Sequence, residues 1–472
     1  MLDEHGRYII HDYQQQRPFS SLLPGVAGPM GIPMWVFYVN RGQIISSFGV
    51  QDKDHAFMEF QPANKAYQTT PLTGFRTFIK CDSKFADVYE PFSPWQSATG
   101  IQRDLFIGMN EVEIQETNPT RGLQINVLYF TLPGEPFAAL IRQVTLTNIG
   151  AASVDLELLD GMPAAIPYGI DHRNIKDISR TIEAWMQVLY LDQRLPYFRV
   201  GTSIGDSAEV SVVEKGFFAL SVLDGQLLTP VVDPAVVFRQ DTSLYAPNGF
   251  QVTPLDDLLH QPQVTRGKTP CAFFGSKASL PPGEVVSLTS AFGMVNDLAM
   301  LEKVHFRFTT PGFIPQKMLE ARAVTANLTE AIACRTSSDL FDGYSRQTFL
   351  DNALRGGWPV VLGSEANQVV YHLYSRKHGD LERDYNAFFL AAEHYSQGNG
   401  NFRDVIQNRR NDVFFHPRVG DFNIRTFLSL IQPDGYNPLV VKGSRFLLNP
   451  DDFARVMAQV ENPDLLRPVL SH

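Results

Sequence analysis

The pattern of apolar and polar residues changes character along the chain. From about residue 34 to residue 295, apolar residues recur at every second position, most clearly over 123–129 and 154–158. This period of two predicts β-strands that each bury one face. Turn signals separate the strands, so the pattern predicts a large antiparallel β-sandwich, a super-β-sandwich. Further strands are expected over 35–40, 44–50, 75–80, 209–213 and 285–294.

A helical period replaces the period of two after about residue 313. Before that point one helix is expected, over 178–189, where the apolar residues fall at offsets of four, seven and eleven. Beyond it, helices are expected over 316–335 and 341–354, the second ending at Arg355-Gly-Gly. A third is expected from an N-cap at Asp380 to Gly398. The predicted fold class is therefore a β-sandwich followed by an all-α helical region.

Composition and charge narrow the classes of function. A chain of 472 residues exceeds the size of one hydrophobic core, and 44% hydrophobic residues can fill several. The net charge of −10 argues against a nucleic-acid partner, which would need a concentrated basic surface. Cys81, Cys271 and Cys334 are widely spaced, so neither a disulfide framework nor a zinc ribbon is expected. No membrane segment or leader is recognisable, so a cytoplasmic location is expected.

The segment 396–412 carries the most informative candidate chemistry. A glycine-rich stretch, Gln397 to Asn401, leads into a helix that is rich in asparagine, aspartate, glutamine and arginine. Asparagine and aspartate are mediocre helix formers, whereas their short planar groups suit pairs of sugar hydroxyls. Helical spacing places these candidate substrate-binding residues in two rows: Arg403, Gln407 and Arg410, then Asp404, Asn408 and Asp412. The alternative is a charged helix with internal ion pairs, and the residues alone do not decide between the two.

Other candidate sites have structural explanations. The carboxylates Asp380, Glu382 and Asp384 could serve acid/base chemistry, although capping and i,i+4 pairing account for most of them. His372 and His378 are six residues apart, which does not match metal spacing on a helix, so no metal site is expected. The glycine-rich segment 23–33 lacks the ending of a phosphate loop and reads as a structural loop.

Several segments resemble one enzyme family, the inverting β-oligoglucan phosphorylases, which are related to cellobiose phosphorylases of the glycoside hydrolase 94 and 161 type. The similar segments are Phe19-Ser-Ser-Leu-Leu-Pro-Gly-Val-Ala-Gly-Pro-Met-Gly-Ile-Pro-Met-Trp35, Tyr38-Val-Asn-Arg-Gly-Gln43, 58–68, 74–80, 349–357, 374–386 and Asn408-Arg-Arg-Asn-Asp-Val-Phe-Phe415. The resemblance implies a β-sandwich domain over 1–304, a helical linker over 305–340 and the first helices of an incomplete (α/α)₆ barrel over 341–472.

The resemblance also implies an activity and site residues. Family members cleave β-linked glucose chains with inorganic phosphate as co-substrate, with inversion, and give α-glucose 1-phosphate. They use no further cofactor. In cellobiose phosphorylases an Arg-Asp-x-Asn-Gln-Asp motif holds the sugar, and Arg403, Asp404, Gln407 and Asn408 fall on that pattern. This sequence departs from it at Ile406 and Asn408, which puts the roles of these two positions in doubt.

The same resemblance places the general acid and the phosphate site beyond His472, with Asp404 as the in-chain candidate acid. We therefore expect a fragment or one subunit of a split enzyme, whose partners are a β-linked glucose oligosaccharide, phosphate, and a homodimer mate, second subunit or missing C-terminal half. A hydrolase or transglycosylase on the same scaffold and a non-catalytic carbohydrate-binding or assembly subunit remain alternatives. The glucan linkage is not readable from these residues.

Overall fold

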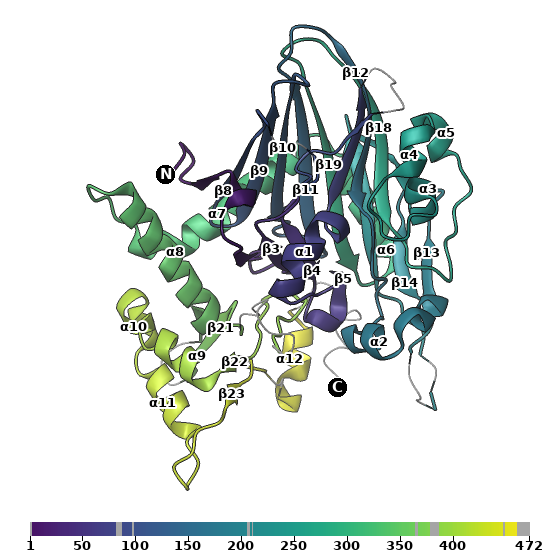
Figure 1. Cartoon of the computed structure of the whole chain (residues 1–472). Coiled ribbons are helices and arrows are strands. Elements are labelled where there is room, and N and C mark those ends of the chain that lie inside the picture. Colours follow the sequence, from purple (N-terminus) through teal and green to yellow (C-terminus); the bar gives the residue numbers. More distant parts are fainter. Residues whose placement is uncertain are drawn as a thin grey trace.

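The computed structural model describes residues 2–81, 87–96, 99–204, 208–209, 211–363, 367–377, 387–446 and 449–459. In this part of the chain, an antiparallel sandwich occupies the first two thirds and helices α6 to α12 occupy most of the rest (Figure 1). The helices α8 to α11 lie beside one end of the sandwich, on the same side of the molecule.

The largest sheet has ten strands, all paired antiparallel in the order β1-β8-β9-β10-β11-β19-β15-β14-β13, with β16 joined to β15. Its long central strands alternate buried and partly exposed positions before becoming wholly buried at one end. The bounds are β1 Tyr8–His11, β8 Gln102–Ile107, β9 Glu111–Asn118, β10 Leu123–Thr131, β11 Ala138–Asn148, β13 Met186–Leu189, β14 Tyr197–Val200, β15 Gly216–Leu223, β16 Gln226–Leu227 and β19 Val285–Val295.

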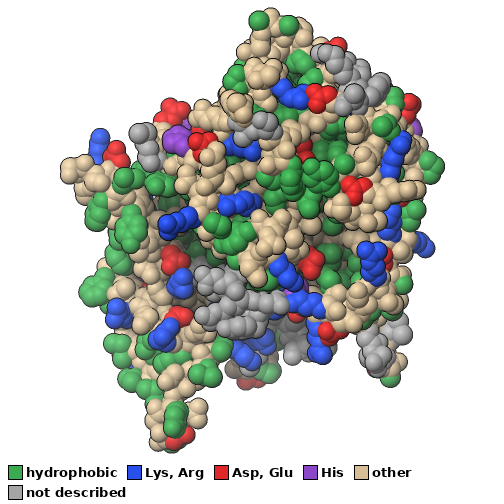
Figure 2. Space-filling model, viewed as in Figure 1, with side chains coloured by type: hydrophobic (Ala, Val, Ile, Leu, Met, Phe, Trp, Pro, Cys, Tyr) green, Lys and Arg blue, Asp and Glu red, His purple; other side chains and the backbone are tan. Residues whose placement is uncertain are grey.

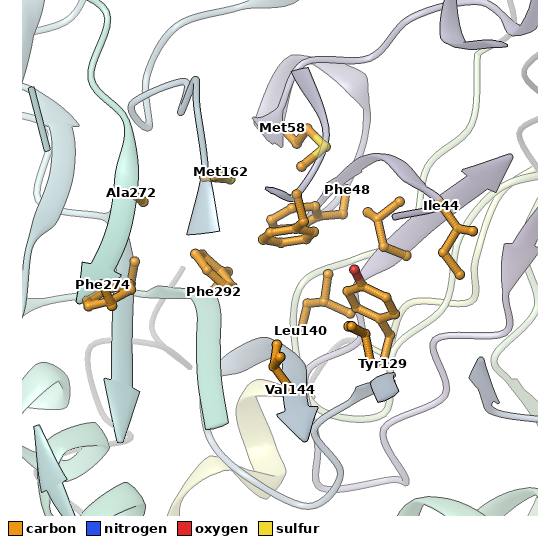
Figure 3. Packing of buried hydrophobic residues seen from close by; sticks show 14 of the residues in the cluster. Ile44, Phe48, Met58, Tyr129, Leu140, Val144, Met162, Ala272, Phe274 and Phe292 are labelled. Atoms are coloured by element: carbon orange, nitrogen blue, oxygen red, sulfur yellow. The ribbon is translucent and has the colours of Figure 1, made fainter. Parts of the chain in front are cut away.

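Two smaller sheets complete the sandwich. One has the order β17-β18-β12-β6-β7, and the other the order β2-β3-β4-β5. Inward-facing residues of all three sheets share one apolar core, in which Phe292 packs near Phe48 and Phe274 (Figure 3). The bounds are β2 Ser20–Leu23, β3 Trp35–Val39, β4 Ile45–Gly49, β5 Ala56–Met58, β6 Arg76–Cys81, β7 Val88–Tyr89, β12 Val154–Met162, β17 Thr229–Val231 and β18 Ala272–Leu280.

Most strands predicted from the period of two are confirmed. The alternating segments 123–129 and 154–158 lie in β10 and β12, and the other confirmed segments lie in β3, β4, β6 and β19. The strand predicted over 209–213 is wrong, because its described residues hold only an isolated bridge at Val212. The strand nearby is β15, whose residues are almost all buried, so its sequence shows no alternation.

The helix predicted over 178–189 is also wrong in its extent. A short α-helix, α2 (His172–Asp177), precedes a 3₁₀ segment, Ser179–Trp185, and the chain then enters β13. Of the apolar residues that suggested one helical face, Ile178 lies between α2 and the 3₁₀ segment, Ile182 and Trp185 lie in that segment, and Leu189 lies in β13. The remaining helices of the sandwich region are α1 Ala63–Thr73, α3 Pro234–Phe238, α4 Asn248–Val252 and α5 Leu255–Leu259.

Two of the three predicted C-terminal helices are confirmed, as α7 and α8. The third, from Asp380 to Gly398, begins outside the described residues, and its described part is not helical, since Leu390 bridges both Gln51 and Gly398 and a turn lies at 394–395. Two small sheets, β20–β21 and β22–β23, also depart from the all-α prediction. The bounds are α6 Leu298–Thr309, α7 Phe313–Thr329, α8 Asp339–Gly356, β20 Trp358–Leu362, β21 Val369–Leu373, β22 Gly400–Asn401, α9 Phe402–Arg409, α10 Asp412–Phe415, α11 Phe422–Ser429, β23 Val440–Val441 and α12 Phe453–Met457.

Helices α6 and α7 pack on the outer face of the ten-stranded sheet, through apolar residues that include Val304, Phe308 and Ala321. The predicted boundary between residues 304 and 305 falls inside α6. Among the helices of the described ranges, none has both the length and the apolarity needed to cross a membrane.

A charged network lies inside the sandwich. Arg142 of β11 and Asp160 of β12 are both fully buried, and Nη2 of Arg142 donates to Oδ1 of Asp160 at 2.6 Å. The same nitrogen donates to Thr77 of β6 at 3.0 Å and to Gln43, which precedes β4. Tyr129 of β10 accepts from Nη1. One guanidinium thus connects all three sheets.

The Asp160→Ala variant should lose about 3–5 kcal/mol of unfolding free energy, because it leaves the Arg142 charge buried without its carboxylate. Urea denaturation measures this loss. As a control, Asp256→Ala removes an acid from an exposed ion pair with Lys277 and should cost about 1 kcal/mol or less. Equal losses in the two variants would show that the buried pair does not connect the sheets energetically.

Candidate functional site

Two consecutive glycines bring the end of α8 against α9 and β21. A Cβ atom on Gly356 would lie 2.9 Å from the Cβ of Asn408, and one on Gly357 would lie 2.6 Å from the Cβ of His372. Gly357 also has a φ of 93°, in the region that favours glycine. The predicted helix stop at Arg355-Gly-Gly is thus confirmed, and it has a second role in close packing.

The row of α9 that contains Arg403, Gln407 and Arg410 faces solvent. The Arg403 side chain is 81% exposed, and its Nε donates to the neighbouring Asp404 at 3.3 Å. Within the described part of the chain, the side chains of Gln407 and Arg410 make no hydrogen bond or ion pair. Arg403 and Gln407 lie on α9 and Arg410 directly follows its last residue, so three planar groups are exposed along this segment.

The second row, formed by Asp404, Asn408 and Asp412, is engaged in internal contacts. Asn401 donates to Asp404 at 3.1 Å, and Asn408 donates to the Asp404 carbonyl at 2.6 Å. The hydrogen bond from Asn401, supported by Arg403, holds the pKa of Asp404 below its usual value. Asp404 is therefore ionised at neutral pH, and it does not carry the proton that a general acid would donate.

Asp412 belongs to a buried cluster beneath α9. Its Oδ2 lies 3.0 Å from Nε2 of His372 and accepts from Asn423 at 2.9 Å. Burial, reinforced by the positive charge of Arg409, lowers the pKa of His372 to about 4, so this ring is neutral at pH 7. Arg409 donates to the Gly356 carbonyl at 2.6 Å and to Ser375 at 3.2 Å. These contacts fix α9 against the end of α8 and against β21.

A small cavity of about 40 Å³ lies between α8, β20 and the segment from Asn408 to His416. Its lining mixes aromatic rings, such as Trp358, with polar groups, such as Asn411 and Asp412. Nε2 of His416 is buried without a hydrogen-bond partner among the described residues. A water molecule occupies roughly 30 Å³ of liquid, so this cavity has room for water but not for a sugar ring.

The remaining candidates from the sequence are the carboxylates and the histidine within 378–384, the glycine-rich segment 23–33 and a metal site. Asp380, Glu382, Asp384 and His378 lie outside the described residues. Segment 23–33 is a tightly packed loop, where a Cβ on Gly25 would lie 2.0 Å from the Met34 carbonyl oxygen. Among the described residues, no group of three or more His, Cys, Asp or Glu side chains is arranged to hold a metal ion.

The sequence pattern did not predict the contacts of Arg409 and Asn423 or the role of His372. A signal existed for Arg409, because it lies four residues after Val405, the buried apolar residue of α9, and therefore shares its inner face. No such spacing joins His372 to Asp412, which are 40 positions apart in the sequence.

The low pKa of His372 predicts a specific pH dependence of stability. Because the folded pKa lies near 4 and an unfolded histidine titrates near 6.5, the contribution is fully present above pH 6.5 and is lost as the pH falls towards 4. The loss should reach about 3 kcal/mol in urea denaturation series at stepped pH. In His372→Asn the slope over this interval should flatten.

A control variant, Phe427→Leu, removes packing from the same region without removing a titratable group. It should lower stability by a similar amount at every pH in the interval. An unchanged slope in His372→Asn would refute the assignment of this pH dependence to the His372–Asp412 cluster.

Comparison with known proteins yields no family. No family model matches the chain, and no curated protein matches it. A bacterial glucoamylase in complex with acarbose is 11% identical and has a TM-score of 0.41, with 95% of this chain and 58% of that chain covered. A putative kojibiose phosphorylase from the human microbiome is 8% identical (TM-score 0.25; 73% and 32% covered). A family GH92 α-mannosidase from Bacteroides thetaiotaomicron is 9% identical (TM-score 0.25; 71% and 39% covered). The chain thus spans less than two thirds of each of these proteins, and the TM-scores are too low to establish a shared fold or activity.

Proposed function

We propose that this chain is part of an inverting glycoside phosphorylase that cleaves β-linked glucose oligosaccharides with inorganic phosphate and releases α-glucose 1-phosphate. In this proposal the C-terminal helices are the opening helices of an (α/α)₆ barrel, and α9 holds the sugar beside the scissile bond. The observation that carries the proposal is the exposed row of Arg403, Gln407 and Arg410, which lies on the helix whose sequence resembles the sugar-binding motif.

The contacts of α9 and the residues after it support different roles for the two rows, one engaged inside the protein and one open to a ligand. Asn408 donates to the Asp404 carbonyl within α9, and Asp412, the first residue of α10, contacts His372 and Asn423, so these planar groups are engaged inside the protein. Arg403, Gln407 and Arg410 are exposed, and Arg403 pairs only with the neighbouring Asp404, so the three planar groups are accessible to a ligand. The Asp404 side chain is 28% exposed and ionised, so it can accept a hydrogen bond from a sugar hydroxyl beside Arg403.

The surface charge is compatible with a neutral ligand. On the face of the molecule shown in Figure 2, basic and acidic side chains are interspersed, without a continuous basic surface. Arg403 and Asp404 balance each other in charge, and Arg410 leaves the row with one positive charge. Vicinal hydroxyl groups of a glucose unit match forked donors and carboxylate acceptors of this kind.

The proposed reaction is a single displacement. A carboxylic acid protonates the glycosidic oxygen while a phosphate oxygen attacks the anomeric carbon from the opposite face, so one C–O bond breaks as another forms. From the resemblance to the phosphorylases, we assign the acid and the phosphate site to residues beyond His472, on a missing C-terminal half or a second subunit. A homodimer mate is a further proposed partner, and the proposed location is the cytoplasm.

The Arg403→Ala and Arg410→Ala variants should each weaken the binding of β-gluco-oligosaccharides by about 1.5–3 kcal/mol, the scale of a charge-assisted hydrogen bond. Isothermal titration calorimetry measures the change. As a matched control, Arg425→Ala removes an arginine of α11 that is 75% exposed and should leave the affinity unchanged. Equal affinities in all three folded variants would show that α9 has only a structural role.

The chain alone should release no glucose 1-phosphate from β-glucan oligomers and phosphate, because attack at the anomeric carbon needs a positioned acid and a phosphate cradle together. Supplying the remaining helices in cis or in trans should create phosphate-dependent release. Robust product from the chain alone would contradict our placement of the acid, and sugar release without phosphate would identify a hydrolase instead.

A further inference from the structure

Two exposed aromatic rings meet on the sandwich, far along the sequence from α9. Trp95 belongs to the connection from β7 to β8 and is 43% exposed, while Tyr245 belongs to the loop between α3 and α4 and is 50% exposed. Their ring centroids are 5.2 Å apart, and their planes meet at 71°. Each ring leaves a large apolar surface in contact with water, so a pair of them marks a surface suited to binding.

A buried arginine holds this aromatic pair in place. Arg76 of β6 donates from Nε and Nη2 to the Glu90 carboxylate at 2.6 and 2.8 Å. Its Nη2 also donates to the Tyr245 carbonyl at 2.9 Å. One guanidinium therefore connects the chain just before Trp95 to the loop that carries Tyr245. Because this contact already joins the two loops, a ligand that stacks here would lose little free energy in ordering them, which favours binding.

A polar hollow begins at the residue after Trp95. It measures about 460 Å³, within the range of about 300–1,000 Å³ that is usual for small-molecule sites. Gln96 lines the hollow, and its side chain donates to the Val88 carbonyl at 3.4 Å. Asn118, which is 4% exposed, and Thr120 contribute further amide and hydroxyl groups. The aromatic pair and the polar hollow are therefore joined through the adjacent residues Trp95 and Gln96.

The charged groups of the hollow pair with each other. Arg121 donates to both oxygens of Asp87, at 3.0 and 2.8 Å, and its guanidinium lies 4.8 Å from the centre of the Tyr89 ring. Because Asp87 neutralises Arg121, the described lining offers no net positive charge for a phosphate or another anion. The lining offers hydrogen-bond donors and acceptors side by side, which suits a neutral ligand with many hydroxyl groups.

We infer that this surface is a second carbohydrate-binding site, specific for neutral β-linked gluco-oligosaccharides and separate from α9. In a β-linked glucose unit the hydroxyl groups lie around the rim, and the C–H bonds point to the two flat faces. Such a face matches the negative face of an aromatic ring, and the rim hydroxyls reach the hollow. The choice of a glucan rests on the proposed function, whereas the neutral, hydroxyl-rich class of ligand rests on the surface itself.

The test is a calorimetric titration of the full chain with laminarihexaose and cellohexaose, with maltohexaose as the α-linked control. Trp95→Ala should weaken one binding event by about tenfold, the scale of losing one aromatic contact. Trp185→Ala removes another exposed tryptophan of the sandwich region, 37% exposed, and is the matched control. Circular dichroism confirms that each variant is folded.

Arg403→Ala separates the two sites. A binding event that is unchanged in Arg403→Ala and about tenfold weaker in Trp95→Ala establishes the second site, even if α9 binds no sugar. Identical titrations for the wild type, Trp95→Ala and Trp185→Ala would overturn the inference, whatever Arg403→Ala shows. Binding of maltohexaose as tightly as the β-linked ligands at the Trp95 site would overturn the specificity for β-linked chains.

Discussion

The cross-sheet pair of Arg142 and Asp160 is the interaction on which the architecture depends. Three sheets meet around it, because Arg142 also reaches Thr77 of a second sheet and Gln43 at the edge of a third. Two ions in an apolar core are costly to desolvate, and each is satisfied only when all three sheets are in register. A slip by one residue in β11 or β12 would turn one partner to the opposite face.

The helical part depends on this sandwich for its position. Arg322 of α7 makes a two-point ion pair with Glu111 at the start of β9, at 2.6 and 2.8 Å. Lys317 of the same helix lies 2.9 Å from Glu135. Farther on, Phe388 packs among Trp35 and Phe37 of the four-stranded sheet. These contacts hold α7 and Phe388 against the sheets. Helix α8 lies between them in the chain and α9 follows Phe388, so the contacts set the orientation of the exposed row relative to the sheets.

The sequence correctly predicted those elements that bury a single face. β10 and β12 alternate because each has one core face, and α7 and α8 lie within continuous helical periods. It failed where burial or tertiary contacts override local pattern. β15 is buried on both faces, and the described residues near Leu390 are extended because they pair with Gln51 and Gly398. In the candidate site, helical spacing predicted the shared faces of Arg403 with Gln407 and of Asp404 with Asn408, but α9 ends at Arg409, so Arg410 follows the helix and Asp412 begins α10. It could not predict that Asp412 pairs with His372, since that contact depends on where two glycines let three elements meet.

The central claim is that the outward row of α9 binds a β-linked glucose chain. The most direct measurement is a crystal structure of the chain with a saturating concentration of a β-gluco-oligosaccharide. The account predicts electron density for glucose units within hydrogen-bond distance of Arg403, Gln407 and Arg410, with the internal contacts of Asn408 and Asp412 unchanged. A structure in which sugar occupies the Trp95 surface, or no surface, while the α9 row binds only solvent would contradict it.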